Sequence, residues 1–212
     1  DALFMREAIA LARRSRPSPN PRVGCVFVRD DLGFSIVGRG FHRSAGSPHA
    51  EAVALDDAGA RARGVTAYVT LEPCNHHGRT PPCTDALLRA GVSRVVIGMA
   101  DPNPHVAGGG TERLRAAGVR VDTGVEEPAC RALLRAWQHA VLRGVPYVTL
   151  KVGMSLDGRI ATRTGASKWI TGAPARADAH ALRARSDAVL VGIGTAMADD
   201  PLLTARGVDL TA

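Results

Sequence analysis

Aromatic residues and long apolar runs are both scarce in this chain. Only 4% of its 212 residues are Phe, Trp or Tyr, and a surface that stacks single-stranded nucleic acid usually needs several exposed aromatics. No apolar run reaches the roughly 18 residues that a membrane-spanning helix needs. There is also no block of five or six like charges, no internal repeat and no low-complexity segment. These absences argue against a membrane protein and against a single-strand binding protein.

The chain begins Asp1-Ala2-Leu3-Phe4-Met5. This start is typical of a helix and not of a signal peptide. It contains no initiator Met at position 1, so we expect a few residues to precede it.

Cysteine is also sparse, with four residues in the chain. Two of them belong to a metal-binding pattern described below. Cys25 lies in an apolar strand-like run and Cys130 in a helical one, so we expect both to be buried as small hydrophobic side chains. Thiolate ligands without a disulfide framework indicate a reducing, cytoplasmic location.

Basic residues outnumber acidic ones in this chain, which gives it a formal net charge of +7 and a pI of about 10.0. This balance favours acidic partners, but it does not distinguish nucleic acid from a small phosphorylated metabolite.

A split metal-binding signature is the most informative feature that is present. It consists of His49-Ala50-Glu51, then Pro73-Cys74, then Pro82-Cys83. One imidazole and two thiolates make a three-ligand zinc site, and a catalytic zinc keeps its fourth position open for water. Zinc nucleobase deaminases combine such ligands with a non-ligand Glu as general acid and base, in the pattern H-x-E…P-C-x-x-C. Here eight residues rather than two separate the cysteines.

The alternative interpretation of this signature is a structural zinc site of the zinc-knuckle type, without catalysis. It would need a fourth protein ligand, for which His76 and His77 are available between the cysteines. That reading leaves Glu51 without a role.

Alternating strand and helix patterns run through the first 145 residues and predict a three-layer α/β domain. We expect helices at 3–14, 50–62, 84–90, 111–117 and 127–142, and strands at 23–28, 36–41, 67–71, 94–99 and 119–123. We expect Thr84 or Asp85 near the N-cap of the third helix. His49 and Cys83 then lie at helix starts, where the positive end of the helix dipole favours thiolate over thiol.

The pattern starts again after Gly144-Val145-Pro146. Strands are expected at 147–154 and 187–194, with a helix at 174–185 between them. We therefore expect domains at 1–144 and 145–212. The second contains too few elements for an independent core, and we expect it to be incomplete.

With these motifs in view, residues 5–206 resemble the bifunctional riboflavin-biosynthesis deaminase/reductase family. The resemblance is carried by 19–24 (PNPRVG), 48–52 (PHAEA), 70–84 (TLEPCNHHGRTPPCT), 101–104 (DPNP), 151–161 (KVGMSLDGRIA), 167–172 (SKWITG), 192–195 (GIGT) and 199–206 (DDPLLTAR). It implies a cytidine-deaminase-like α/β domain followed by a partial dihydrofolate-reductase-like α/β domain. It also implies zinc-dependent deamination of 2,5-diamino-6-ribosylamino-4(3H)-pyrimidinone 5′-phosphate and NADPH-dependent reduction of the ribosyl group to ribityl.

The resemblance implies a role for each matching residue. Glu51 would be catalytic, and His49, Cys74 and Cys83 would hold zinc. The deaminase substrate would contact Asn20, His42, His76, Arg79, Asp101 and Asn103. The reductase substrate would contact Lys151, Ser167, Arg183, Leu203 and Arg206, and NADPH would contact Gly153, Trp169, Thr195 and Asp199.

Chemistry supports part of this assignment. Asn20 offers both a donor and an acceptor, which suits a pyrimidine amide edge, and Pro19 and Pro21 stiffen its backbone. Arg79 or Arg43 could meet the 5′-phosphate. The resemblance further implies a small phosphorylated pyrimidine as partner, with neither nucleic acid nor membrane, and a homo-oligomer, either dimer or tetramer.

Three competing functions are open at this point. The first is a deaminase-only enzyme with an inactive or truncated reductase domain. The second is a deaminase of tRNA or other nucleic acid, which the basic pI favours and the low aromatic content opposes. The third is a non-catalytic zinc protein, which the presence of Glu51 beside the ligands opposes.

Overall fold

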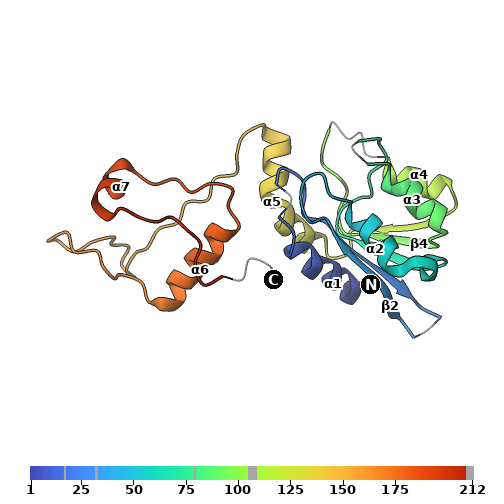
Figure 1. Cartoon of the computed structure of the whole chain (residues 1–212), viewed down its shortest axis with the longest axis horizontal. Helices are drawn as coiled ribbons and strands as arrows, with labels where there is room; N and C mark the ends of the chain where they lie inside the picture. Colours follow the sequence, from blue (N-terminus) through green and yellow to red (C-terminus); the bar gives the residue numbers. More distant parts are fainter. Residues whose placement is uncertain (17, 32, 79, 105–108, 209–212) are drawn as a thin grey trace. The chain divides into compact units, whose positions relative to one another are not determined.

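The chain folds into two compact units, Asp1–Tyr147 and Val148–Ala212 (Figure 1). The structure is a computed structural model that describes residues 1–16, 18–31, 33–78, 80–104 and 109–208. Among these residues, no helix is both long and apolar enough to cross a membrane.

The first unit is built on a five-stranded mixed sheet with the order β2-β1-β3-β4-β5. Its strands are β1 (Gly24–Arg29), β2 (Ser35–Phe41), β3 (Thr66–Val69), β4 (Arg94–Ile97) and β5 (Arg120–Thr123). β1 is antiparallel to β2 and β3, whereas β3, β4 and β5 are mutually parallel. β1 and β3 are buried along nearly their whole length, as expected for strands covered on both faces.

Helices cover both faces of this sheet and make the expected three-layer fold (Figure 1). On one face, α1 (Ala2–Arg13) contacts α5 (Glu127–Arg143). On the other face, α2 (Ala50–Ala58), α3 (Cys83–Ala90) and α4 (Gly110–Ala116) contact one another in series. The core between the layers contains the side chains of Phe27, Val95 and Leu114.

Two glycines let helices approach the sheet closely. A Cβ on Gly24 would lie 1.9 Å from the carbonyl oxygen of Ala8 in α1. A Cβ on Gly40 would lie 2.1 Å from the carbonyl oxygen of Ala50, the first residue of α2. Both distances are far below van der Waals contact, so only glycine fits. Gly40 thereby sets the start of α2, and with it His49 and Glu51, directly against β2.

The predicted elements of the first unit agree with the structure apart from their ends. The expected helix 50–62 is divided, because Gly59 adopts a positive φ of 54° and a 3₁₀ helix, η1 (Gly59–Ala62), follows it. The start of α3 agrees with the expectation: Pro82 is the N-cap residue, Cys83 is the first helical residue, and Thr84 and Asp85 follow within the first turn. Cys25 and Cys130 are fully buried, as expected.

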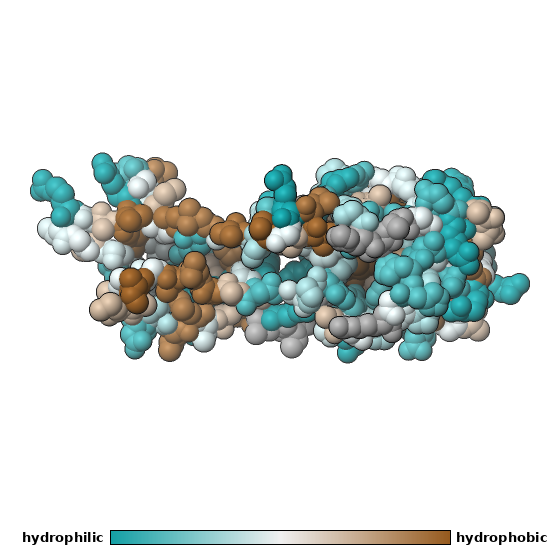
Figure 2. All heavy atoms as spheres, turned by 90° about the horizontal axis from the view of Figure 1, so that it is seen from above, coloured by the Kyte–Doolittle hydropathy of each residue, from teal (hydrophilic) through white to brown (hydrophobic). Residues whose placement is uncertain are grey.

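The second unit contains two helices, α6 (Ala173–Ala184) and α7 (Ile193–Asp199). Among residues 148–208 the structure forms no strand, so the strands expected at 147–154 and 187–194 were wrong. A strand needs neighbours for its backbone N–H and C=O groups and for its side chains, and here Leu150 is 85% and Leu190 97% exposed. Figure 2 shows such hydrophobic side chains on the surface of this unit, at the left of the view.

Candidate metal centre and adjoining pocket

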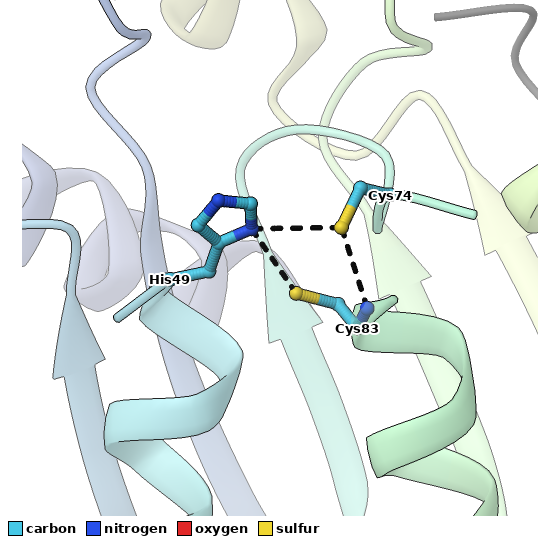
Figure 3. A group of neighbouring side chains, drawn as sticks. All are labelled: His49, Cys74 and Cys83. Atoms are coloured by element: carbon cyan, nitrogen blue, oxygen red, sulfur yellow. Dashed lines mark hydrogen bonds between the residues drawn. The ribbon is translucent and has the colours of Figure 1, made fainter. Parts of the chain in front are cut away.

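Three separate elements bring His49, Cys74 and Cys83 together (Figure 3). His49 is the N-cap residue of α2, Cys83 is the first residue of α3, and Cys74 lies in the loop that follows β3. His49 Nδ1 is 3.5 Å from Cys74 Sγ and 3.3 Å from Cys83 Sγ. The three potential ligand atoms all lie within 4.8 Å of one another.

These separations fit a tetrahedral zinc ion. Zn–S bonds of about 2.3 Å and a Zn–N bond of about 2.0 Å at tetrahedral angles place the nitrogen roughly 3.5 Å from each sulfur. The observed distances of 3.5 and 3.3 Å match that edge length. Among the described residues, this is the cluster of three or more His, Cys, Asp or Glu side chains that could hold a metal, and neither His76 nor His77 belongs to it. The donor set therefore fits zinc with a fourth position open.

The local structure favours a thiolate at Cys74. The backbone N–H of Cys83 donates to Cys74 Sγ at 3.3 Å. Hydrogen bonds from the Cys83 thiol and from His49 lower the pKa of Cys74 to about 4. For Cys83 the pKa is raised, because it donates to Cys74 and is buried. The pair of Cys74 and Cys83 thus carries one thiolate and one thiol, and its negative charge favours the binding of a cation.

Glu51 lies beside the cluster and is buried, with an exposure of 3%. Burial raises the pKa of its carboxyl to about 7, and the negative charge of Cys74 acts in the same direction, while His49 opposes both. A carboxyl group with a pKa near neutrality can both accept and return a proton at physiological pH. The structure therefore places a buried carboxyl group with a raised pKa among the residues of the His–Cys–Cys cluster.

A pocket of about 340 Å³ opens onto this centre. Its walls include His49 and Cys74 together with two of the predicted substrate residues, Asn20 and His76. Pro19, the loop 45–47, Gly78 and Thr80 contribute the remaining lining. The structure therefore brings the sequence-predicted Asn20 and His76 to the metal cluster.

The predicted residue His42 lies behind the pocket wall. It is 3% exposed, and its ring packs edge-on against that of His49 with a centroid separation of 5.4 Å. Its Nε2 is 3.0 Å from Asn20 Nδ2, and its Nδ1 is 3.0 Å from the carbonyl oxygen of Pro48.

Asp101 and Asn103 follow β4 on the same sheet edge as Cys74, because β3 and β4 are parallel. The backbone N–H of Asn103 donates to Asp101 Oδ1 at 2.8 Å. Partial burial raises the pKa of Asp101. The charge of Cys74 also raises it, whereas the charge of His76 lowers it. Neither residue lines the pocket described above. The predicted Arg79 lies outside the described residues.

Sequence reasoning missed Glu72 as a positioning residue. Its Oε1 accepts the N–H of Thr111 at 2.9 Å and its Oε2 accepts the N–H of Asp101 at 3.2 Å. Glu72 therefore joins the loop before Cys74 to the loop after β4 and to the start of α4. Its place two residues before Cys74 was visible in the sequence, but its partners are remote along the chain.

The predicted reductase residues are distributed over the second unit. Lys151 and Gly153 line a cavity of about 180 Å³ with Thr171, Ala175 and Asp178. Trp169 is 75% exposed and lies under the Arg176 guanidinium at 4.6 Å from its ring centroid. Lys168 pairs with Asp199 at 3.1 Å. Arg206 donates to Thr204 Oγ1 at 2.9 Å, and the remaining predicted residues, Ser167, Arg183, Thr195 and Leu203, do not line this cavity.

The fold and the His–Cys–Cys cluster define the first unit as a domain of the zinc-binding deaminase class. Residues 1–99 match the cytidine and deoxycytidylate deaminase zinc-binding region, and residues 146–212 match the RibD C-terminal domain. A guanine deaminase from Nitrosomonas europaea shares the fold at 21% identity, with a TM-score of 0.51 over 65% of this chain and 84% of its own.

More specific relatives identify the family. The chain is 52% identical to the riboflavin biosynthesis protein RibD of Escherichia coli over 212 residues, and 50% identical to that of Aquifex aeolicus over 210 residues. These alignments cover 99% and 98% of this chain, but 57% and 58% of the relatives.

A crystal structure from Thermotoga maritima is described as a diaminohydroxyphosphoribosylaminopyrimidine deaminase/5-amino-6-(5-phosphoribosylamino)uracil reductase. It superposes with a TM-score of 0.90 at 45% identity, over 97% of this chain and 59% of its own. The chain belongs to the RibD family, and it spans somewhat more than half the length of the relatives that it matches.

Proposed function

We propose that the first unit is a hydrolytic deaminase whose zinc is held by His49, Cys74 and Cys83. Its substrate is 2,5-diamino-6-ribosylamino-4(3H)-pyrimidinone 5′-phosphate, a step of riboflavin biosynthesis. The observation that carries this proposal is the buried Glu51 beside a three-donor cluster that opens onto a pocket. Membership of a family whose members are named for riboflavin biosynthesis supports the choice of substrate.

The chemistry is a replacement of an amino group by oxygen at a ring carbon. A zinc ion in this position supplies Lewis-acid activation of water, whose pKa such an ion lowers from about 15.7 to about 7. Glu51 accepts the proton of the attacking water and returns it to the departing ammonia, so that one C–O bond forms and one C–N bond breaks. Asn20 and His76 contact the pyrimidine in the pocket. Asp101, Asn103 and Arg79 complete substrate recognition, and Arg79 or Arg43 receives the phosphate.

We propose that the second unit contributes to an NADPH-dependent reductase that reduces the ribosyl group to ribityl. Lys151, Ser167, Arg183, Leu203 and Arg206 would face the substrate. Gly153, Trp169, Thr195 and Asp199 would face NADPH, whose own chemistry delivers the hydride while the protein orients it. The cavity lined by Lys151 and Gly153 supports this placement for those two residues. A reducing cytoplasm suits the thiol ligands, and we expect the protein to work as a homo-oligomer, either a dimer or a tetramer.

A deaminase-only function is the second candidate. It is favoured by the second unit, which forms no strand among residues 148–208 and leaves Leu150, Leu156 and Leu190 at least 85% exposed. Under this reading the zinc site works while the reductase is inactive or truncated.

Mass spectrometry of the proposed substrate, incubated with the zinc-loaded chain, tests both candidates. Without NADPH, deamination raises the substrate mass by about one unit, as an amino group becomes a carbonyl. A further rise of about two units that appears only with NADPH shows an active reductase. The first rise without the second establishes the deaminase-only function. If neither appears with zinc bound, the proposed substrate is wrong, and tRNA is the next substrate to try.

A further inference from the structure

Asn20 and His42 form a hydrogen-bonded pair at the wall of the pocket. Asn20 lines the pocket with His49 and Cys74, and its Nδ2 lies 3.0 Å from Nε2 of the buried His42. His42 itself does not line the pocket. Its effect on a bound molecule therefore passes through Asn20.

The carbonyl group of Pro48 determines which ring nitrogen of His42 carries the proton. His42 Nδ1 is 3.0 Å from that carbonyl oxygen, which can only accept a hydrogen bond, so Nδ1 must donate. Ser47 agrees with this assignment. Its hydroxyl donates to the carbonyl oxygen of Ser44 at 2.7 Å, so its contact with His42 Nδ1 at 3.4 Å can only be that of an acceptor.

The position of this proton then fixes the orientation of the Asn20 amide. A neutral imidazole with a proton on Nδ1 has a lone pair on Nε2. None of the ring's hydrogen-bond partners Asn20, Ser47 and Pro48 is a carboxylate that would stabilise a second proton in this buried position. Nε2 must therefore accept, and Asn20 must present its NH₂ group rather than its carbonyl oxygen. One carbonyl oxygen and one N–H of Asn20 remain for a ligand, with a fixed polarity.

We propose that His42 is a positioning residue that sets the amide of Asn20 in one orientation, so that the pocket recognises a pyrimidine edge with one order of donor and acceptor. The inference rests on the proposed deaminase function for the identity of that ligand, but the proton arrangement itself does not. In the sequence, His42 was expected to contact the substrate directly. The hydrogen bonds that link Pro48, His42 and Asn20 instead assign His42 an indirect role. If the Asn20 amide were rotated by 180°, its carbonyl oxygen would face the lone pair on His42 Nε2.

The first test reads the proton position without any substrate. Long-range ¹H–¹⁵N spectra of the zinc-loaded, ¹⁵N-labelled chain distinguish the two neutral tautomers and the charged ring, and a His42→Gln variant assigns the signal. We expect a protonated Nδ1 and an unprotonated Nε2. In Asn20→Ala the tautomer should persist while the Nε2 resonance moves, because it loses its donor. A proton on Nε2 in the unsubstituted chain would overturn the proposal, whatever the substrate of the enzyme is.

The second test is a double-mutant cycle on deamination, with zinc content measured in every variant. Asn20→Ala and His42→Phe should each lower kcat/KM about tenfold or more, and the double variant should be no worse than the worse single one, because both remove one interaction. His42→Gln should recover part of the loss, since its amide oxygen can accept from Asn20. Independent, multiplying losses would contradict the proposal, as would a His42→Gln variant that retains zinc but is no better than His42→Phe.

Loss of zinc from His42→Phe is a separate outcome, because the His42 ring packs against His49. In that case Asn20→Ala and His42→Gln decide the question, and the tautomer does so independently. A normal tautomer without any turnover of the diaminopyrimidine by the unsubstituted chain would refute the proposed function and leave the positioning role intact.

Discussion

Thr84 donates a hydrogen bond from its hydroxyl to Asn75 Oδ1 at 3.0 Å, and so joins the residues that directly follow Cys83 and Cys74. The backbone N–H of Thr84 also donates to the carbonyl oxygen of Cys74 at 3.2 Å. Thr84 is fully buried. These bonds close the loop between the two cysteines, so protein contacts already hold the sulfur atoms near each other.

This relationship predicts that Thr84→Val weakens zinc binding while leaving all three ligands in place. Hydrogen bonds around the metal ligands hold these ligands in place, and their loss typically lowers the affinity for the metal by about 10–100-fold. Competition with a chromogenic chelator measures the affinity. Thr84→Ser, which retains the hydroxyl, is the matched control and should bind zinc nearly normally. Equal affinities for Thr84→Val and Thr84→Ser would show that the Asn75 bond has no part in the site.

Removal of the Glu51 carboxyl group, the proposed acid and base, should separate metal binding from catalysis. We expect Glu51→Gln to retain zinc and to lose deamination by about 10²–10⁴-fold, because the amide cannot carry the proton. Glu112→Gln makes the same substitution on the exposed surface of α4 and should leave the rate unchanged. Near-normal deamination by Glu51→Gln would exclude Glu51 as the proton carrier.

Cys130, a buried cysteine outside the cluster, provides a control for ligand removal. Cys83→Ala should abolish stoichiometric zinc binding, whereas Cys130→Ala, which empties space in the core near Gly98, should lower stability but retain zinc. Because a ligand that binds only the folded state stabilises it, a chelator should lower the Tm of the first unit in Cys130→Ala and not in Cys83→Ala. Elemental analysis and thermal unfolding with and without chelator check both statements. A zinc-replete Cys83→Ala would contradict the ligand assignment.

Glu72 should matter more than its partly exposed position suggests. Both of its carboxylate oxygens accept backbone N–H groups, from Asp101 and Thr111, and Glu72→Gln leaves one of these donors without an acceptor. We expect a loss of about 1–3 kcal/mol in the free energy of unfolding, together with a higher KM because Asp101 loses its anchor.

Chemical denaturation and steady-state kinetics measure the two effects of Glu72→Gln. Glu127→Gln is the control, since Glu127 makes an ion pair with Arg131 four residues later on α5. Such pairs contribute only about 0.3–0.5 kcal/mol. If Glu72→Gln is no more destabilised than Glu127→Gln, the two hydrogen bonds that Glu72 accepts do not contribute to stability.

Gly40 should tolerate no side chain. A Cβ there would lie 2.1 Å from the carbonyl oxygen of Ala50, so Gly40→Ala must displace the start of α2. Overpacking a core typically costs about 1–3 kcal/mol. Since His49 and Glu51 flank Ala50, zinc affinity should fall together with stability. Gly194→Ala is the control, because the added carbon there meets no atom within 4 Å apart from its chain neighbours and the backbone of its own helix. A stable Gly40→Ala with normal zinc content would refute the argument.

Most of the first unit could be predicted from its sequence because local patterns and local chemistry coincide there. Short apolar runs rich in Val and aromatic residues become β1 and β3, and a Val-Val-Ile run becomes β4. The helical spacing of α1 and α5 agrees with their buried faces. The ligand set was equally visible, because each donor lies in a short motif of distinctive composition.

The strands expected in the second unit failed for a corresponding reason. An apolar run such as 187–194 is compatible with a strand, but strand formation depends on neighbours that a local pattern does not specify. In the described part of this unit those residues instead lead into α7.

The sequence alone determined the three potential metal donors and the proposed acid–base group, since residue types and short spacings encode them. Only the tertiary structure decided their geometry. It brought His49, Cys74 and Cys83 to tetrahedral separations from three elements, and it buried Glu51 so that its pKa rises to about 7. It also placed His42 behind Asn20 rather than in the pocket. Distances, burial and hydrogen-bond partners arise from contacts between segments remote along the chain, and no local pattern contains them.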